Sequence, residues 1–397
     1  MLFNKDFYSI SPEDITRLLK YEVIEDKTIE YKRDLPGDTR DERKEFLSDV
    51  SSFANASGGM IFYGISEENG TPTEIIGVDV NDVDAVILQL QQVILNNIEP
   101  RLTQLLIRRV NLDDGKTIII IRIPYSWSRP HVVNYQKHWR FYIRTSAGKH
   151  PMDYDEVKSS MLQSFNIPEK IRQFRKERLD KILQDDFEVP FFSPSFVALH
   201  LIPFSALFNS NVSNIDFDVI PENPYKIEPL HISISYSRHN FDGYICYSRL
   251  NNVAGFTGYV QVFRNGIFES VDTKMLNRGN EQKKFVPSYL LEEAIINSTR
   301  NYLDFQKQMG VLPPIAIFIS LLNIKDYYFA VSRNLDPFED KKFKLQRQSI
   351  LLPELIIDDF DIDVVSCLRD SFNLLWNSFG WERSFSYDQD GNWVGGN

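Results

Sequence analysis

The stretch over residues 40–64 most constrains the fold, because an amphipathic helix pattern there runs directly into a buried strand pattern. Apolar residues at Phe46, Val50 and Phe53, with their apolar neighbours, fall on one face of an α-helix. Gly58 and Gly59 follow, and glycine readily ends a helix in the left-handed conformation. The apolar run MIFYGI comes next and predicts a buried strand. This order predicts a fold in which helices pack on a sheet.

Patterns on both sides extend the same α+β unit. We expect helices over 12–21, 82–97 and 152–165, and strands over 28–34, 74–80, 104–110, 117–124 and 139–146. Asn69–Gly70 and the LDDGK segment carry residues that suit the positive φ of hairpin turns. The segment 125–138 is predicted to be a long loop, and loops of that length often carry function.

The length predicts two domains, since single cores seldom exceed roughly 250–300 residues. We expect a first domain over 1–165 and a charged helical connector over 166–188. A second α+β domain is expected over 189–397. It shows no catalytic constellation, so its expected part is packing, dimerisation or sensing of a partner.

Several observations favour a cytoplasmic protein without a membrane span. The first 20 residues lack the basic and apolar regions of an export signal. The apolar segment 189–208 contains three prolines and is rich in residues typical of strands, so it predicts sheet. The chain has only two cysteines, Cys246 and Cys367, far apart in sequence, which indicates a reducing compartment.

Charge is distributed unevenly along the first domain. The net charge of −11 argues against a protein that coats nucleic acid indiscriminately. Residues 51–100 nevertheless contain seven acids and no Lys or Arg, whereas residues 101–150 contain ten Lys or Arg and two acids. No phosphate-binding GxxxxGK[ST] loop, HExxH zinc motif or GxSxG nucleophile motif occurs. The contrast in charge therefore needs another explanation.

Three carboxylates of the first domain could form a metal site. Glu25 and Glu30 flank one turn, and Glu67 follows the buried strand MIFYGI. Carboxylates that converge from neighbouring strands suit Mg²⁺ or Mn²⁺, which can activate water and neutralise phosphate charge. Because strand side chains alternate, an offset of five places Glu25 and Glu30 on one face only across a turn or bulge. The alternative is a solvated strand, and the spacing alone favours it.

The basic part interleaves cations with aromatic rings, a composition used to hold phosphates and stack bases. The candidate nucleic-acid contacts are Arg129, His131, Arg140, Arg144 and Lys149, accompanied by Trp127, Tyr135 and Trp139. The alternative is that Arg140 to Ile143 alternate along a half-buried strand, with Arg144 exposed. The residues leave both interpretations open.

From Glu25 to Gly77, with SRPH and FYIRTSAGKHPM further on, the sequence resembles the Schlafen core, an AlbA-type domain, over about residues 12–165. The resemblance implies an α+β domain that binds nucleic acid and, in nuclease members, a metal-dependent endoribonuclease acting on structured RNA such as tRNA. It carries catalytic roles onto Glu25, Glu30, Glu67 and Lys32, with the three glutamates as metal ligands. Glu67 stands where aspartate is usual in the family, and Ser66 replaces an acidic neighbour.

The sequence thus leads to a Schlafen-like endoribonuclease that uses Mg²⁺ or Mn²⁺, with a part in stress or phage defence. RNA is the favoured partner and DNA the alternative, and a homodimer is expected by analogy with paired Schlafen lobes. A rival hypothesis is a non-catalytic DNA-binding or regulatory protein whose second domain senses a partner.

Overall fold

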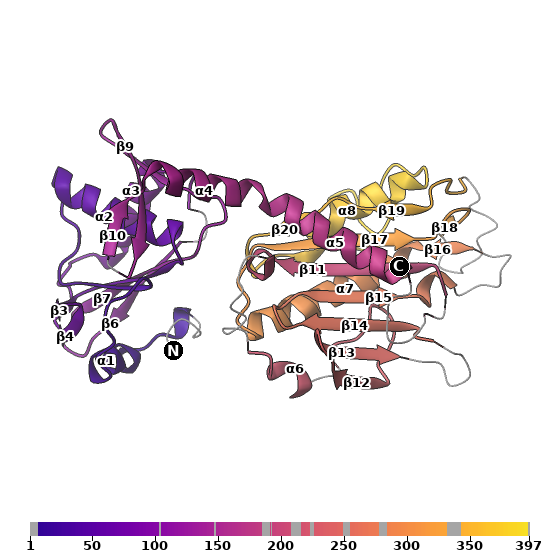
Figure 1. The fold of residues 1–397 in the computed structure, drawn as a ribbon, viewed down its shortest axis with the longest axis horizontal. Coiled ribbons are helices and arrows are strands. Elements are labelled where there is room, and N and C mark those ends of the chain that lie inside the picture. The colour runs from indigo at the N-terminus through magenta and orange to yellow at the C-terminus, as the bar shows by residue number, and fades with distance from the viewer. Residues whose placement is uncertain are drawn as a thin grey trace. The chain divides into compact units, whose positions relative to one another are not determined.

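The computed structural model describes residues 7–102, 105–146, 148–184, 191, 193–207, 216–222, 226–248, 255–277, 284–331 and 343–395. The chain divides into two compact units, residues 1–167 and residues 168–397. Each unit combines helices with β-sheets, which confirms the α+β class (Figure 1). In these ranges, the helices are all too short or too polar to cross a membrane.

The first unit is built on a four-stranded sheet with helices on both faces. Its strands, in spatial order, are β1 (Ile29–Lys32), β2 (Gly59–Tyr63), β7 (Thr117–Ile123) and β6 (Leu106–Asn111). Helix α1 (Pro12–Lys20) packs on one face, and α2 (Arg40–Asn55) and α3 (Val83–Asn97) pack on the other. Because both faces are covered, every residue of β2 is buried.

Side-chain caps fix where these helices begin. Thr39 accepts a hydrogen bond from the Glu42 N–H while the Glu42 carboxylate returns to the Thr39 N–H, so α2 starts with a capping box. Asp82 accepts from the Ala85 N–H at 2.9 Å and starts α3. β1 and β2 are parallel, and α2 is the crossover helix between them.

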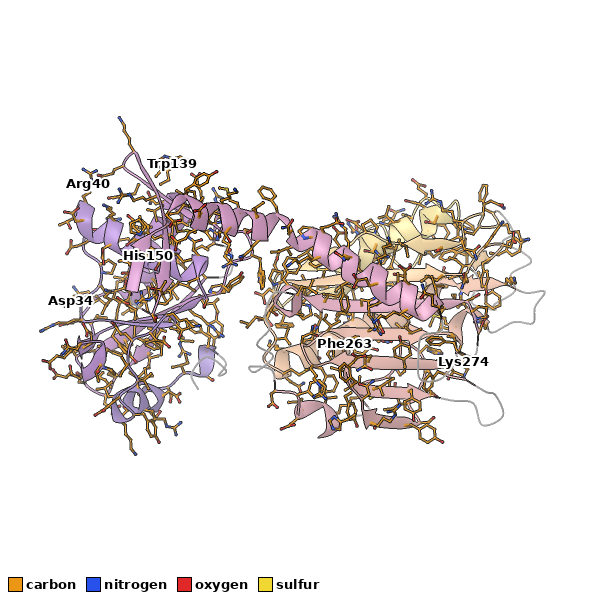
Figure 2. The ribbon with its side chains drawn as sticks, in the orientation of Figure 1. Asp34, Arg40, Trp139, His150, Phe263 and Lys274 are labelled. Carbon is orange, nitrogen blue, oxygen red and sulfur yellow. The ribbon has the colours of Figure 1, made fainter. Side chains whose placement is uncertain are left out.

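A second four-stranded sheet packs against α2. Its strands, in spatial order, are β10 (Gly148–Pro151), β9 (His138–Thr145), β8 (Val132–Tyr135) and β5 (Ile98–Glu99), and α4 (Tyr154–Phe165) follows. The prediction that 125–138 is all loop was wrong, since β8 lies inside it and pairs with β9. Gln136 and Lys137 have φ of 49° and 66°, which allows a tight turn without glycine. Trp139 lies just after this turn and is 62% exposed (Figure 2).

A short hairpin stands apart from both sheets. It joins β3 (Ile65–Glu68) to β4 (Thr71–Ile75) through Asn69 and Gly70, whose φ values are 55° and 79°. Positive φ at both central residues is what a tight hairpin turn requires, as the sequence indicated. The pairing shifts between Ser66 and Glu67, so a bulge turns Glu67 relative to its neighbour.

The second unit contains an eight-stranded antiparallel sheet. Its strands, in spatial order, are β12 (Tyr236–His239), β13 (Gly243–Ser248), β14 (Gly258–Phe263), β15 (Phe268–Asp272), β11 (Phe196–Pro203), β17 (Ile315–Leu322) and β19 (Ser349–Leu351), with β20 (Leu355–Ile357) also paired to β17. A parallel pair, β16 (Phe285–Pro287) and β18 (Tyr328–Ala330), lies outside this sheet, as does the short α6 (Val219–Glu222).

Helices cover both faces of the large sheet. Helix α5 (Ile167–Leu183) packs on one face, where Figure 1 shows it crossing the strands, and α7 (Ser288–Gln308) and α8 (Val364–Ser378) pack on the other. The predicted connector is therefore mostly α5, and its residues 185–188 lie outside the described ranges. Arg178 of α5 donates two hydrogen bonds of 2.8 Å to Glu269, a fully buried carboxylate that also pairs with His200.

Candidate active site

A turn places Glu25 and Glu30 within reach of each other. Asp26 accepts hydrogen bonds at its Oδ1 from the N–H groups of Thr28, at 2.6 Å, and Ile29, at 3.0 Å. This local turn separates Glu25 from the strand that carries Glu30. The odd spacing of five residues is thus accommodated by an intervening turn, which was the condition for the two carboxylates to act together.

The β3–β4 turn brings Glu67 to the same place. The Glu25 N–H donates to the Gly70 carbonyl at 2.7 Å, and the Gly70 N–H donates to Glu67 Oε2 at 2.5 Å. Glu25 Oε1 accepts from the Tyr31 N–H at 2.7 Å. Glu25 is half-buried and Glu67 is exposed. In the described part of the chain, the second carboxylate oxygen of each has no hydrogen-bond donor.

The charges of the other two predicted carboxylates act on Glu25. Burial raises the pKa of Glu25, and the negative charges of Glu30 and Glu67 raise it further, against the Tyr31 N–H and Lys32, which lower it. Burial also acts to raise the pKa of Glu30, but Lys32 and Arg144 outweigh it and leave that pKa lowered. Of Glu25 and Glu30, Glu25 therefore has the negative charge that neighbouring cations compensate less.

Two cations hold Glu30. Lys32 Nζ lies 2.6 Å from Glu30 Oε1, and the Arg144 guanidinium donates to Glu30 Oε2. Arg144 is itself buried, and its guanidinium lies 4.5 Å from the centre of the Phe53 ring. The alternative interpretation in which Arg144 is exposed was therefore wrong, because β9 turns Arg144 toward α2 and β1. Lys32 is partly exposed, so it can also reach a ligand.

Asp49, like Glu45, is a member of this cluster that sequence reasoning missed. It lies on α2 with a side chain only 3% exposed, and Lys149 Nζ lies 2.6 Å from its Oδ1. Lys32 Nζ lies 3.8 Å from its other oxygen, and Glu45 also pairs with Lys149 at 2.6 Å. Burial raises the pKa of Asp49 despite both lysines, whereas the charges of Asp49 and Glu30 raise the pKa of Lys32 against the effect of burial.

The sequence did contain a signal for Asp49. α2 has an apolar face and also a set of small or polar residues that the structure buries: Ser48, Asp49, Ser51, Ser52 and Asn55. A helix with an apolar face and a second face of mostly small, uncharged polar residues is typically buried on both sides. Asn55 shows the reason, because its side chain donates to the carbonyls of His131 and Tyr142 and accepts from the His131 N–H.

Two other predicted contacts lie outside this cluster. His131 is fully buried, with Nδ1 at 2.6 Å from the Pro100 carbonyl and Nε2 at 2.5 Å from the Ser126 hydroxyl. Burial lowers its pKa to about 4, so it is neutral at physiological pH and holds two loops together. Arg129 is half-buried, stacks on Tyr125 with 4.5 Å to the ring centre, and donates to the Asn55 carbonyl at 3.2 Å.

The donor set fits a hard divalent ion in part. Five carboxylates and three cations gather here, which leaves a formal excess of two negative charges: Glu25, Glu30, Glu45, Asp49 and Glu67 against Lys32, Arg144 and Lys149. Glu25 and Glu67 each keep an oxygen for a ligand, whereas both Glu30 oxygens are engaged. Within the described residues, no three acidic, histidine or cysteine side chains are gathered closely enough to hold an ion. Mg²⁺ commonly binds through only one or two carboxylates with waters and substrate phosphates.

Comparisons with known proteins give one family match. Residues 25–153 match the family model described as Schlafen, AlbA_2. A comparison with curated proteins gives no match. Among solved structures, the DIP2311 protein from Corynebacterium diphtheriae is similar at 18% identity and a TM-score of 0.24. That similarity covers 32% of this chain and 25% of that one, so the matched part spans about a quarter of the other protein.

Proposed function

We propose, from the Schlafen AlbA_2 domain at residues 25–153, that the first unit binds nucleic acid and cleaves RNA with the help of Mg²⁺ or Mn²⁺. The family itself indicates a function related to nucleic acid. One observation carries the finer proposal: Glu25, Glu30 and Glu67 come from three separate segments, and Gly70 hydrogen bonds and a local turn bring Glu67 and Glu30 close enough to act on the charge of Glu25.

Glu25 and Glu67 are the residues that would hold the ion. Each has a free carboxylate oxygen, and the Gly70 backbone fixes both segments through the two hydrogen bonds described above. A divalent ion at such a site supplies a water of lowered pKa and neutralises phosphate charge. Its positive charge would also relieve the repulsion that raises the pKa of Glu25.

Lys32 would contact the scissile phosphate. Its ammonium group is partly exposed and is shared between Glu30 and Asp49, at 2.6 Å and 3.8 Å. A phosphate that draws Lys32 away would release one oxygen of Glu30 for the ion or for the attacking water. Arg144 would stay on the other Glu30 oxygen and keep that buried carboxylate ionised and oriented.

Cleavage of separate substrates tests this proposal. We expect the purified protein to cut a tRNA pool with Mg²⁺ or Mn²⁺, to be inactive with EDTA, and to act less on single-stranded DNA. Faster cutting of DNA than of RNA would overturn the RNA assignment. Cutting that persists in EDTA would overturn the part given to the ion.

A second function is favoured by the two cations on Glu30. A carboxylate already neutralised by Lys32 and Arg144 suits a structural ion-pair network beneath a binding surface. Under this alternative the protein binds DNA or RNA without cutting it. It predicts that Glu25→Gln and Glu67→Gln leave the affinity for nucleic acid unchanged and that neither RNA nor DNA is cleaved.

The proposed partner set also includes a second copy of the chain, and the proposed setting is stress or phage defence. Both follow from the resemblance to Schlafen proteins. Light scattering of the full chain, with and without RNA, tests the homodimer, and a mass of about 46 kDa under both conditions would exclude it. Survival of cells after phage infection, with active and Glu67→Gln protein, tests the defence role.

A further inference from the structure

A pocket on the first unit lies apart from the carboxylates and combines two cations with aromatic and apolar side chains. It is lined by Lys44 of α2, Val133 and Tyr135 of β8, and Arg140 and Tyr142 of β9. Val133 pairs directly with Arg140 in the β8–β9 ladder. Because alternate residues of a strand share a face, Tyr135 and Tyr142 lie on that same face.

The two cations of this pocket differ from Arg144 and Lys149, the two other predicted contacts on β9 and β10. In the described ranges, neither Lys44 nor Arg140 forms an ion pair or a side-chain hydrogen bond. Arg144 and Lys149 are instead held by Glu30 and Asp49. Arg140 is exposed and Lys44 is half-buried, so both can donate to a ligand.

The pocket and the carboxylate cluster lie along one face of β9. Arg140, Tyr142 and Arg144 follow each other at intervals of two residues, so Tyr142 stands between the pocket and the guanidinium that holds Glu30. Four residues of a strand span about 13 Å. Tyr142 and Arg144 are buried, so the pocket opens to solvent at the Arg140 end of this face.

We propose that this pocket binds one nucleotide of a single-stranded nucleic acid, with its phosphate on Lys44 and Arg140 and its base against the ring of Tyr135. The proposal rests on the nucleic-acid function proposed above and adds the place where the strand is held. Unpaired cations beside an aromatic ring are the combination by which proteins grip single strands without reading their sequence. Val133 and Tyr142 supply the apolar surface under the base.

Salt dependence separates phosphate contacts from stacking. The slope of log affinity against log salt is negative, and we expect the double variant Lys44→Ala/Arg140→Ala to reduce its magnitude by about 0.7, the value for one phosphate contact on a single strand. Each single variant should reduce it by less. Tyr135→Leu should weaken binding by roughly 5-fold to 150-fold with an unchanged slope, and Tyr135→Phe should restore it. Lys176→Ala, an exposed lysine of the second unit, is the matched control and should leave both quantities unchanged.

The experiment is fluorescence anisotropy of the full chain with labelled poly-U and poly-dT oligonucleotides, in parallel, over a range of salt. Similar effects of the variants on both ligands would support a site for either strand, and effects on one ligand alone would assign the pocket to that ligand. Wild-type binding with unaltered variants would overturn the pocket and leave the nucleic-acid function standing. Absence of wild-type binding to either single strand would overturn the pocket, and the cleavage of the tRNA pool would then decide the nucleic-acid function separately.

Discussion

Lys149 Nζ and the buried Asp49 carboxylate lie 2.6 Å apart, although 100 residues separate them in the sequence. The pair joins β10 of the second sheet to α2, which also packs on the first sheet. It thereby links the basic segment 101–150 to α2, which leads into the acidic segment 51–100. Part of the positive charge of residues 101–150 is therefore used in internal pairs.

Removal of Lys149 should destabilise the first unit. Lys149→Met leaves the Asp49 charge buried with only the more distant Lys32, so we expect a loss of roughly 2–3 kcal/mol in the free energy of unfolding. Glu45, the exposed partner of Lys149, supplies the control. Glu45→Gln should lower the free energy of unfolding by less than about 1 kcal/mol. Urea unfolding followed by circular dichroism measures both variants.

A double mutant isolates the pair itself. Lys149→Met combined with Asp49→Asn should recover at least about 1 kcal/mol relative to the sum of the single changes, because the second change removes the unpaired charge. Strict additivity of the two single effects would show that the pair is not coupled.

Gly70 should matter for activity as well as for stability. Gly70 and Gly115 occupy hairpin turns with φ of 79° and 83°, so an alanine at either position should cost about 1–2 kcal/mol. A Cβ at Gly70 would lie 3.4 Å from the Glu25 Cβ, whereas a Cβ at Gly115 meets no atom within 4 Å. We expect Gly70→Ala alone to slow RNA cleavage, on the order of tenfold. Equal cleavage rates for the two variants would show that the turn at Gly70 does not position the active site.

The second unit should lose stability as pH rises toward neutrality. Burial raises the pKa of Glu292 to about 7, and its side chain accepts hydrogen bonds from Trp376 Nε1 and Ser386. The folded state therefore binds this proton more tightly than the unfolded state, so the contribution of Glu292 is greatest below pH 4.5 and is lost as pH rises to about 7. The full effect is on the order of 3 kcal/mol.

Glu292→Gln tests this pH dependence, because glutamine keeps the shape of the side chain and carries no charge at any pH. We expect the variant to be more stable than the wild type at pH 8 and to differ little at pH 5, as measured by the thermal unfolding of the full chain. A stability difference between variant and wild type that does not change with pH would show that Glu292 does not cause the pH dependence.

Local patterns predicted much of the first unit. The helix over Arg40–Asn55, the glycine stop and the buried strand Gly59–Tyr63 are all present, because each depends on periodicity and caps within a few residues. The prediction of a loop over 125–138 failed for a physical reason, because Val132–Tyr135 forms a strand by pairing with β9. The β3–β4 turn succeeded because Asn69 and Gly70 carry their own conformational preference.

The site was less accessible to sequence reasoning. Glu25, Glu30 and Glu67 were singled out from the sequence, and the resemblance made them the favoured metal ligands. Their grouping depends on hydrogen bonds to Gly70 and on a turn at Asp26. Asp49 was missed because its partners come from β1 and β10, which no local pattern connects. The burial of His131 and Arg144 likewise follows from tertiary packing, so composition alone suggested surface contacts for both.

The most direct test of the carboxylate centre is the single-turnover rate of RNA cleavage at saturating Mn²⁺ for the wild type, Glu67→Gln and Glu68→Gln. Glu67 and Glu68 are exposed neighbours on β3, and only Glu67 bonds to Gly70 and acts on the charge of Glu25. The account predicts a loss of about 10²-fold or more for Glu67→Gln and an unchanged rate for Glu68→Gln. Equal rates for all three proteins would contradict it.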